Sequence, residues 1–129
     1  MFNSKNSKKQ GDIGLGAAIN YFTSNNYTVC IPLTDSQDYD LVIESDGVLE
    51  TVQVKTTSYM PKDKKYYIVE LRVMGGNQSW SGVVKYFNKN IVNHVFVLTE
   101  SGDKYFIPSN EIKAKCALTL GKEYEKFKV

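Results

Sequence analysis

Cysteine is scarce in this sequence, which contains only Cys30 and Cys116 among its 129 residues. Two isolated cysteines give neither a metal-ligand spacing nor a framework of paired disulfides. We therefore expect reduced, buried thiols in a cytoplasmic protein. The one histidine, His94, lies in an apolar run, so we interpret it as a packed or surface residue and not as a general base.

Long hydrophobic runs are also absent. The apolar stretches are too short to span a bilayer, and the first ten residues, MFNSKNSKKQ, lack the apolar core of a signal peptide. With 42% hydrophobic and 12% aromatic residues, the chain has enough apolar surface for one packed core. We expect a single domain over residues 1–129, without a membrane partner.

Charge is distributed unevenly along the chain. Residues 1–11 carry +3, residues 12–50 carry −7 without a single basic residue, and residues 51–129 carry +6. An acidic cluster in an otherwise basic chain is typical of a metal-dependent enzyme that acts on a polyanion. Ordinary salt pairing between the acidic and basic parts would give the same pattern.

The periodicity of apolar residues predicts one helix followed by several strands. The helix covers about residues 9–25 and ends at Asn25-Asn26, and its apolar stripe consists of Leu15, Ala18, Ile19 and Phe22. Strands are predicted at Tyr27–Leu33, Asp40–Ile43, Leu49–Val54, Tyr66–Met74, Asn93–Thr99 and Lys104–Pro108. Val83–Lys89 could be helical, and Ser109 is expected to cap a further helix. This order indicates an α/β fold with a mixed central β-sheet flanked by helices.

The predicted first helix contains Gly11, Gly14 and Gly16. Each glycine disfavours a helix by about 1 kcal/mol relative to alanine. We therefore expect the helix backbone to approach a strand or a ligand closely. The spacing lacks the third glycine of a dinucleotide-binding fingerprint.

The most informative stretch is a predicted β-hairpin over residues 38–57, with its turn at Asp46-Gly47. Alternation along its second strand places Gln53 and Lys55 together on the face opposite the valines. Asp40 lies across from them on the first strand. A carboxylate opposite an amide and an amine can bind a metal ion and a phosphate. Singly, Asp40 could be a polar cap of its strand, and Lys55 a sheet-edge charge that deters aggregation.

Asp40 followed by Gln53-Val54-Lys55 resembles the signature of the PD-(D/E)xK nuclease superfamily, most closely its QxK branch. That branch includes homing endonucleases associated with group I introns. The sequences IPL, DYDL, QVKTT and YFIP also resemble this family, so that the resemblance extends from about Lys9 to Ile112. It implies a restriction endonuclease-like core and an endonuclease that hydrolyses phosphodiester bonds of double-stranded DNA with Mg²⁺ or Mn²⁺.

The resemblance also implies roles for individual residues. Asp40, Gln53 and Lys55 would be catalytic. Asp40 would ligate the metal with the Val54 carbonyl as a further ligand, and Lys55 would orient the attacking water or stabilise the phosphate. Gln53 is neutral where most of the superfamily has a carboxylate, which favours one weakly held ion over two.

The first helix departs from the family pattern. The superfamily often has a glutamate there, about one turn after the glycine, where this chain has Leu15. Asp12 is the nearby carboxylate. It either faces the metal or stabilises the helix N-terminus electrostatically.

Contacts with DNA are expected from lysines near the N-terminus and in the loop after the hairpin, namely Lys9, Lys62, Lys64 and Lys65. Gly75–Gly82 is a second loop that could contact bases, although the single arginine, Arg72, limits guanine readout. We expect a homo-oligomer, a dimer or tetramer, because one site cuts one strand. The alternatives are a catalytically inactive DNA-binding protein on the same fold and an interaction module with a surface hairpin.

Overall fold

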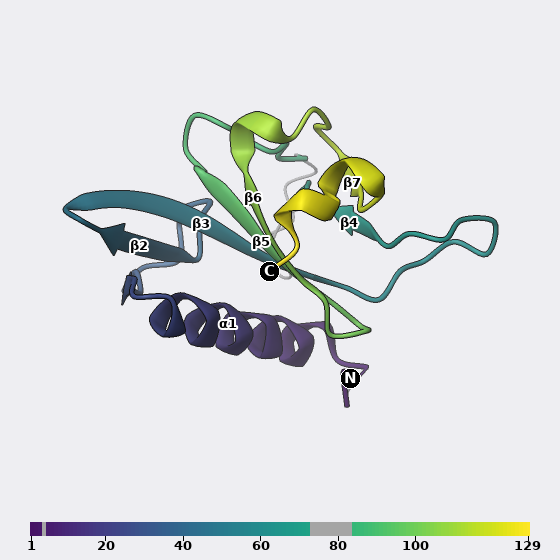
Figure 1. Cartoon of the computed structure of the whole chain (residues 1–129), viewed down its shortest axis with the longest axis horizontal. Coiled ribbons are helices and arrows are strands. Elements are labelled where there is room, and N and C mark those ends of the chain that lie inside the picture. Colours follow the sequence, from purple (N-terminus) through teal and green to yellow (C-terminus); the bar gives the residue numbers. More distant parts are fainter. Residues whose placement is uncertain (4, 73–83) are drawn as a thin grey trace.

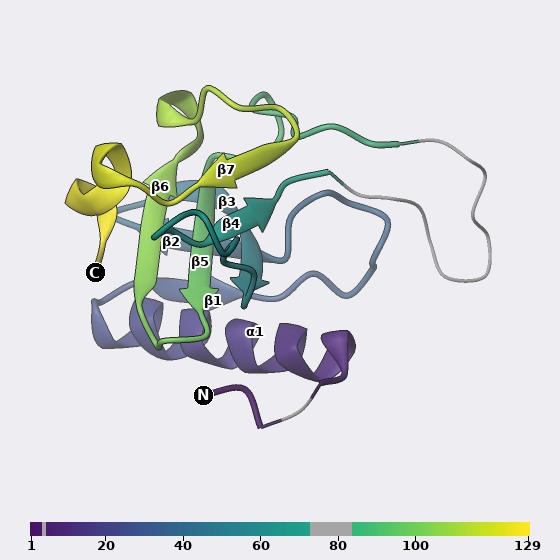
Figure 2. The same cartoon turned by 90° about the vertical axis from the view of Figure 1, so that its right-hand side faces the viewer.

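The computed structural model describes residues 1–3, 5–72 and 84–129, which form three layers (Figures 1 and 2). Helix α1 (Ser7–Ser24) covers one face of a five-stranded sheet. This sheet consists of β1 (Thr28–Cys30), β2 (Leu41–Ser45), β3 (Val48–Thr57), β5 (His94–Thr99) and β6 (Lys104–Pro108). The third layer consists of β4 (Ile68–Glu70), β7 (Ala117–Thr119) and the 3₁₀ helices η1 (Ser109–Glu111) and η2 (Lys122–Phe127).

The central sheet is mixed. Its order is β1-β2-β3-β5-β6, in which β3 and β5 are parallel and the other neighbours are antiparallel. Strands β4 and β7 pair with each other, and the Thr57 hydroxyl at the end of β3 donates to the Ile68 carbonyl of β4 at 2.5 Å. The prediction of a mixed central sheet in an α/β fold is confirmed.

Two apolar clusters hold the layers together. The cluster between α1 and the sheet consists of Ala18, Phe22, Leu41, Ile43, Val52 and Phe96. The cluster on the opposite face includes Val95, Val97, Ile107, Ile112, Leu118 and Tyr124. Strands β3 and β5 are covered on both faces by these clusters, so Gln53 and Thr57 of β3 are buried and Lys55 is half-buried. Within the described residues, no helix is both long and apolar enough to cross a membrane.

Helix α1 ends where its sequence predicts but begins two residues earlier, at Ser7. The Asn6 side chain accepts from the Lys8 backbone N–H at 2.9 Å, which satisfies one of the free donors of the first turn. Asn26, with φ of 68°, adopts the left-handed conformation just after the helix. Ala18 and Phe22 are fully buried against the sheet.

Only one of the three helix glycines in question approaches a strand. A Cβ at Gly14 would collide with the side-chain methyl group of Thr56, whereas Gly11 and Gly16 have open space where a Cβ would lie. Gly14 therefore sets the distance between α1 and β3.

The hairpin of β2 and β3 forms as predicted. Asp46 and Gly47 have φ of 52° and 82°, the positive values that a tight type I′ turn requires. The pair of this ladder farthest from the turn is Leu41 with Val52, and Asp40 directly precedes it on the chain.

The prediction of a second α-helix capped by Ser109 is wrong. Residues 109–111 form one 3₁₀ turn, and no side chain caps it. Ser109 is buried, and its hydroxyl has no hydrogen-bond partner among the described residues. Ile112 follows in extended conformation and inserts fully into the core, which ends the turn.

Residues 84–89 do not form a helix either. Phe87 packs against the core while Lys85 and Tyr86 are exposed. Val83 and the predicted loop Gly75–Gly82 lie outside the described residues.

Other boundaries are narrower than predicted. The strand expected at Tyr66–Met74 is confined to β4, with its last two residues outside the described part, and the strand at Tyr27–Leu33 is confined to β1. Both cysteines are free, but the prediction that they are buried is wrong. Cys30 lies on the outward side of edge strand β1, where alternation turns only Val29 inward. Cys116 is exposed just before β7.

Candidate active site

Asp40 is fixed at the point where the ladder between β2 and β3 ends. Its backbone N–H donates to the Val52 carbonyl at 2.9 Å, and its carboxylate Oδ2 accepts from the Val54 N–H at 2.7 Å. The Asp40 side chain thus accepts the Val54 N–H, which a backbone carbonyl of β2 would accept if the ladder continued. Its second oxygen, Oδ1, has no hydrogen bond to any described residue and is open to a ligand.

The Val54 carbonyl faces the same open edge. The N–H and C=O of one strand residue point to the same neighbouring strand, and the Val54 N–H points to the β2 side. Because β2 pairs with β3 only as far as Val52, the carbonyl of Val54 has no ladder partner in β2. The backbone therefore presents an acceptor beside the Asp40 carboxylate.

Gln53 is almost fully buried, with 7% of its surface exposed. Its amide Nε2 donates to the Asp38 carbonyl at 3.0 Å, which fixes the side chain against the loop before β2. The amide oxygen Oε1 is buried and has no hydrogen-bond partner among the described residues. A buried acceptor without a partner costs about 1–3 kcal/mol, so this oxygen keeps an acceptor site that a water molecule or a ligand would satisfy.

Lys55 and Asp40 line the same hollow and interact electrostatically in a partly desolvated setting. Burial lowers the pKa of the Lys55 ammonium, against the opposing effect of the Asp40 and Glu70 carboxylates. Asp40 keeps an exposed face, yet partial burial raises the pKa of its carboxyl more than the Val54 N–H and Lys55 lower it. Both charged forms are therefore less favourable here than in water, as is typical of functional sites.

Asp40 and Val54 line two adjoining hollows. The loop-side hollow, of about 330 Å³, is lined by Asp35, Ser36, Gln37, Asp38, Asp40, Gln53, Val54, Lys55 and Lys85. The helix-side hollow, of about 390 Å³, is lined by Lys8, Gly11, Asp12, Leu15, Asp40 and Val54. The fold thus gathers every residue for which a catalytic or metal-binding role was expected around one strand end.

The residue that departs from the family pattern, Leu15, lies in the helix-side hollow. Leu15 lines it, so the position at which the superfamily often has a glutamate faces Asp40 but presents an apolar side chain. Asp12, one turn earlier on α1, lines the same hollow and is exposed. Asp12 is therefore the carboxylate of α1 that is available to the site.

The donor set suits a hard divalent cation. Among the described residues, no group of three or more histidine, cysteine or carboxylate side chains converges on one point. Instead, Asp40, Gln53 and Val54 line the same hollow, and a carboxylate, an amide oxygen and a backbone carbonyl are oxygen donors of the kind that Mg²⁺ binds. One charged ligand and two neutral ones favour weak binding of a single ion, with water completing its coordination.

One residue that lines the site could not be identified from the sequence. Lys85 lines the loop-side hollow, and its Nζ lies 2.7 Å from Asp38 Oδ1. The two residues are 47 positions apart, and no local pattern links them. This ion pair holds the 84–90 segment beside the site.

The lysines expected to contact DNA lie outside both hollows. Lys9 is exposed on α1, and the exposed Lys62, Lys64 and Lys65 lie in the loop between β3 and β4. Their contact with DNA stays a prediction.

His94 is packed, with its ring centroid 4.5 Å from that of Phe106 and its Nε2 3.0 Å from Glu50, and lines neither hollow.

Comparison with known proteins agrees with this geometry. The family model described as PD-(D/E)XK endonuclease matches residues 5–126. The solved structure of a bacterial homing endonuclease, I-Ssp6803I, superimposes with a TM-score of 0.76 at 28% sequence identity, covering 90% of this chain and 78% of that one. No curated protein matches the chain. The predicted superfamily resemblance and restriction endonuclease-like fold are confirmed.

Proposed function

Because the chain belongs to the PD-(D/E)XK endonuclease family, we propose that it is a divalent-metal-dependent endonuclease that hydrolyses phosphodiester bonds of double-stranded DNA. The observation that carries this proposal is the unpaired, buried Gln53 amide oxygen beside the Asp40 carboxylate and Lys55. A purely structural glutamine would be expected to satisfy both ends of its amide. The cofactor in this proposal is Mg²⁺ or Mn²⁺.

Asp40, Gln53 and the Val54 carbonyl would hold the ion, and Asp12 faces the adjoining hollow. The bound ion would neutralise charge that develops on the phosphate and lower the pKa of the attacking water. The Val54 N–H holds the carboxylate in one orientation before any ligand arrives, which reduces the reorganisation that binding requires.

Lys55 would act on the phosphate and the attacking water. It lines the loop-side hollow from the same face of β3 as Gln53, and it is partly buried. An ammonium that is partly withdrawn from solvent interacts more strongly with a developing negative charge than an exposed one. Because burial lowers its pKa, Lys55 also gives up a proton more readily than an exposed lysine.

A second candidate function is DNA binding without cleavage. The specific observation in its favour is Leu15, which removes a carboxylate from the helix-side hollow at the position where the superfamily often has one. The neutral Gln53 further lowers the negative charge available to a metal ion.

Supercoiled plasmid distinguishes the two functions. The proposal predicts nicked and linear products with Mg²⁺ and none with EDTA, while DNA binding persists in both. Binding without any product, across Mg²⁺ and Mn²⁺ concentrations, would support the inactive protein instead. Wild-type protein that neither binds nor cuts would contradict both.

We extend the proposal to site-specific cleavage by a homo-oligomer. The structural neighbour is titled a homing endonuclease, and symmetric assembly would present a second site to the second strand. Light scattering should give a mass above the 14.6 kDa of one chain at concentrations that cut both strands. A monomer mass under those conditions would contradict the assembly.

A further inference from the structure

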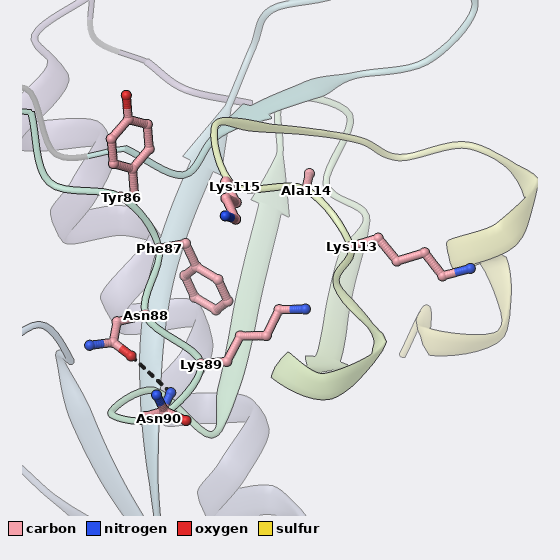
Figure 3. A pocket seen from close by; sticks show the side chains of 8 residues that line it. All are labelled: Tyr86, Phe87, Asn88, Lys89, Asn90, Lys113, Ala114 and Lys115. Atoms are coloured by element: carbon pink, nitrogen blue, oxygen red, sulfur yellow. Dashed lines mark hydrogen bonds between the residues drawn. The ribbon is translucent and has the colours of Figure 1, made fainter.

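A second hollow, which we call the basic hollow, lies beside the segment that Lys85 connects to the candidate active site. It measures about 490 Å³ and is lined by the segments 86–90 and 113–115 (Figure 3). Three lysines line it without any carboxylate: Lys89, Lys113 and Lys115. Figure 3 shows Lys89 and Lys115 extending from the two segments into the space between them.

The hollow has a fixed floor and charged walls. Phe87 and Ala114 are half-buried and pack against the core, which fixes the backbone from which the exposed lysines extend. In the part of the chain that the structure describes, none of the three lysines forms a salt bridge. Unpaired positive charge around a concave surface favours an anionic ligand.

Hydrogen bonds connect the basic hollow to the strand that carries the candidate catalytic residues. The Asn90 N–H donates to Asn88 Oδ1 at 2.9 Å, drawn as a dashed line in Figure 3, and the Val92 N–H donates to the Asn88 carbonyl at 3.0 Å. Thr51 of β3 then bonds the Asn93 side chain through its backbone N–H at 2.8 Å. Thr51 precedes Gln53 and Lys55 on that strand, so the hollow has a defined position relative to them.

We propose that the basic hollow binds backbone phosphates of double-stranded DNA away from the phosphate that is cut. This inference rests on the proposed function and names the surface that holds the substrate. The loop-side hollow of the site contains three carboxylates, Asp35, Asp38 and Asp40, against two lysines, so positive charge outside it would add to the affinity for the DNA backbone. Contacts to flanking phosphates fix register and orientation but carry no base sequence.

The test compares two triple variants with equal loss of charge. In the first, the three lysines of the basic hollow are replaced: Lys89→Ser, Lys113→Ser and Lys115→Ser. In the control, exposed or half-exposed lysines outside both the hollow and the site are replaced: Lys104→Ser, Lys122→Ser and Lys126→Ser. Affinity for a duplex is measured in EDTA over a range of salt concentrations, so that cleavage does not interfere.

Each phosphate contact contributes about 0.9 to the slope of log affinity against log salt. The first variant should have a slope that is shallower by about 2 to 3, and the control an unchanged slope. Replacing the same three lysines with arginine should restore the wild-type slope, because the charge and not the lysine itself is required. An unchanged slope in the first variant, or an equal change in the control, would overturn the inference.

Cleavage by the wild type separates this inference from the proposed function. If wild-type protein cuts plasmid with Mg²⁺ and the first variant keeps the wild-type salt slope, the function stands and the basic hollow is not a DNA surface. If the wild type never cuts but the slope falls as predicted, the DNA surface stands and the proposed chemistry fails.

Discussion

The unpaired amide oxygen of Gln53 gives a prediction with opposite signs for stability and for metal binding. Gln53→Leu keeps a side chain of similar size but removes both polar ends. It loses the bond from Nε2 to the Asp38 carbonyl, worth about 0.5–1.5 kcal/mol, and it relieves the buried, unpaired Oε1, worth about 1–3 kcal/mol. Without metal, the variant should therefore lie between about 0.5 kcal/mol less stable and about 2.5 kcal/mol more stable than the wild type.

Addition of Mg²⁺ should shift this difference in favour of the wild type. An ion that binds only the folded state stabilises it by RT ln(1 + [Mg²⁺]/Kd), about 1.4 kcal/mol at ten times Kd. The wild type should gain this stability and Gln53→Leu should gain little of it, because one of its three oxygen ligands is gone. Thermal unfolding over a Mg²⁺ series, with and without EDTA, measures both effects.

Gln37→Leu is the matched control. Gln37 lines the same hollow, but both ends of its amide are satisfied: Nε2 donates to the Thr34 carbonyl at 2.6 Å, and Oε1 accepts from the Thr34 hydroxyl at 3.2 Å. This variant should respond to Mg²⁺ as the wild type does. If Gln53→Leu gains as much stability from Mg²⁺ as the wild type, Gln53 does not face the ion and the reasoning fails.

Three further predictions concern the site and its support. Lys55→Met should slow cleavage by about 100- to 1,000-fold and weaken DNA binding only slightly, as measured by nicking with Mg²⁺ and by gel shift in EDTA; near-wild-type cleavage would exclude Lys55 from the chemistry. Gln53→Glu should tighten Mg²⁺ binding in calorimetry, because it adds a charged ligand, and an unchanged affinity would place that side chain away from the ion. Gly14→Ala should lower the free energy of unfolding in urea by about 1–3 kcal/mol through its collision with Thr56. Gly16→Ala, with open space around it, should raise it by up to about 1 kcal/mol; a similar effect of both substitutions would contradict the close approach of α1 to β3.

The hairpin and the first helix could be predicted from the sequence because local chemistry determines them. The Asp46-Gly47 turn supplies positive φ, alternation along β3 separates Gln53 and Lys55 from the valines, and Asn25-Asn26 ends the helix. These features place the expected site residues on adjoining elements before any tertiary contact is known.

The rest depends on contacts between distant segments. The ion pair of Lys85 with Asp38 and the basic hollow formed by two separate segments leave no periodic signal in the sequence. The same limit explains the false helix at Ser109, since the burial of Ile112 in extended conformation outweighs the local capping preference. Strand length was overestimated at β1 and β4 because β-branched and aromatic content extends beyond the residues that pair.

The most direct test of the central claim compares plasmid nicking by the wild type, Asp40→Asn and Asp35→Asn with Mg²⁺. Asp40→Asn keeps an oxygen that can accept the Val54 N–H but loses the charged metal ligand; Asp35→Asn removes an equal charge from the same hollow. The account predicts near-wild-type nicking by Asp35→Asn and a loss of about 100-fold or more by Asp40→Asn, with its fold intact. Nicking by Asp40→Asn within a few-fold of the wild type would contradict the assignment of this site.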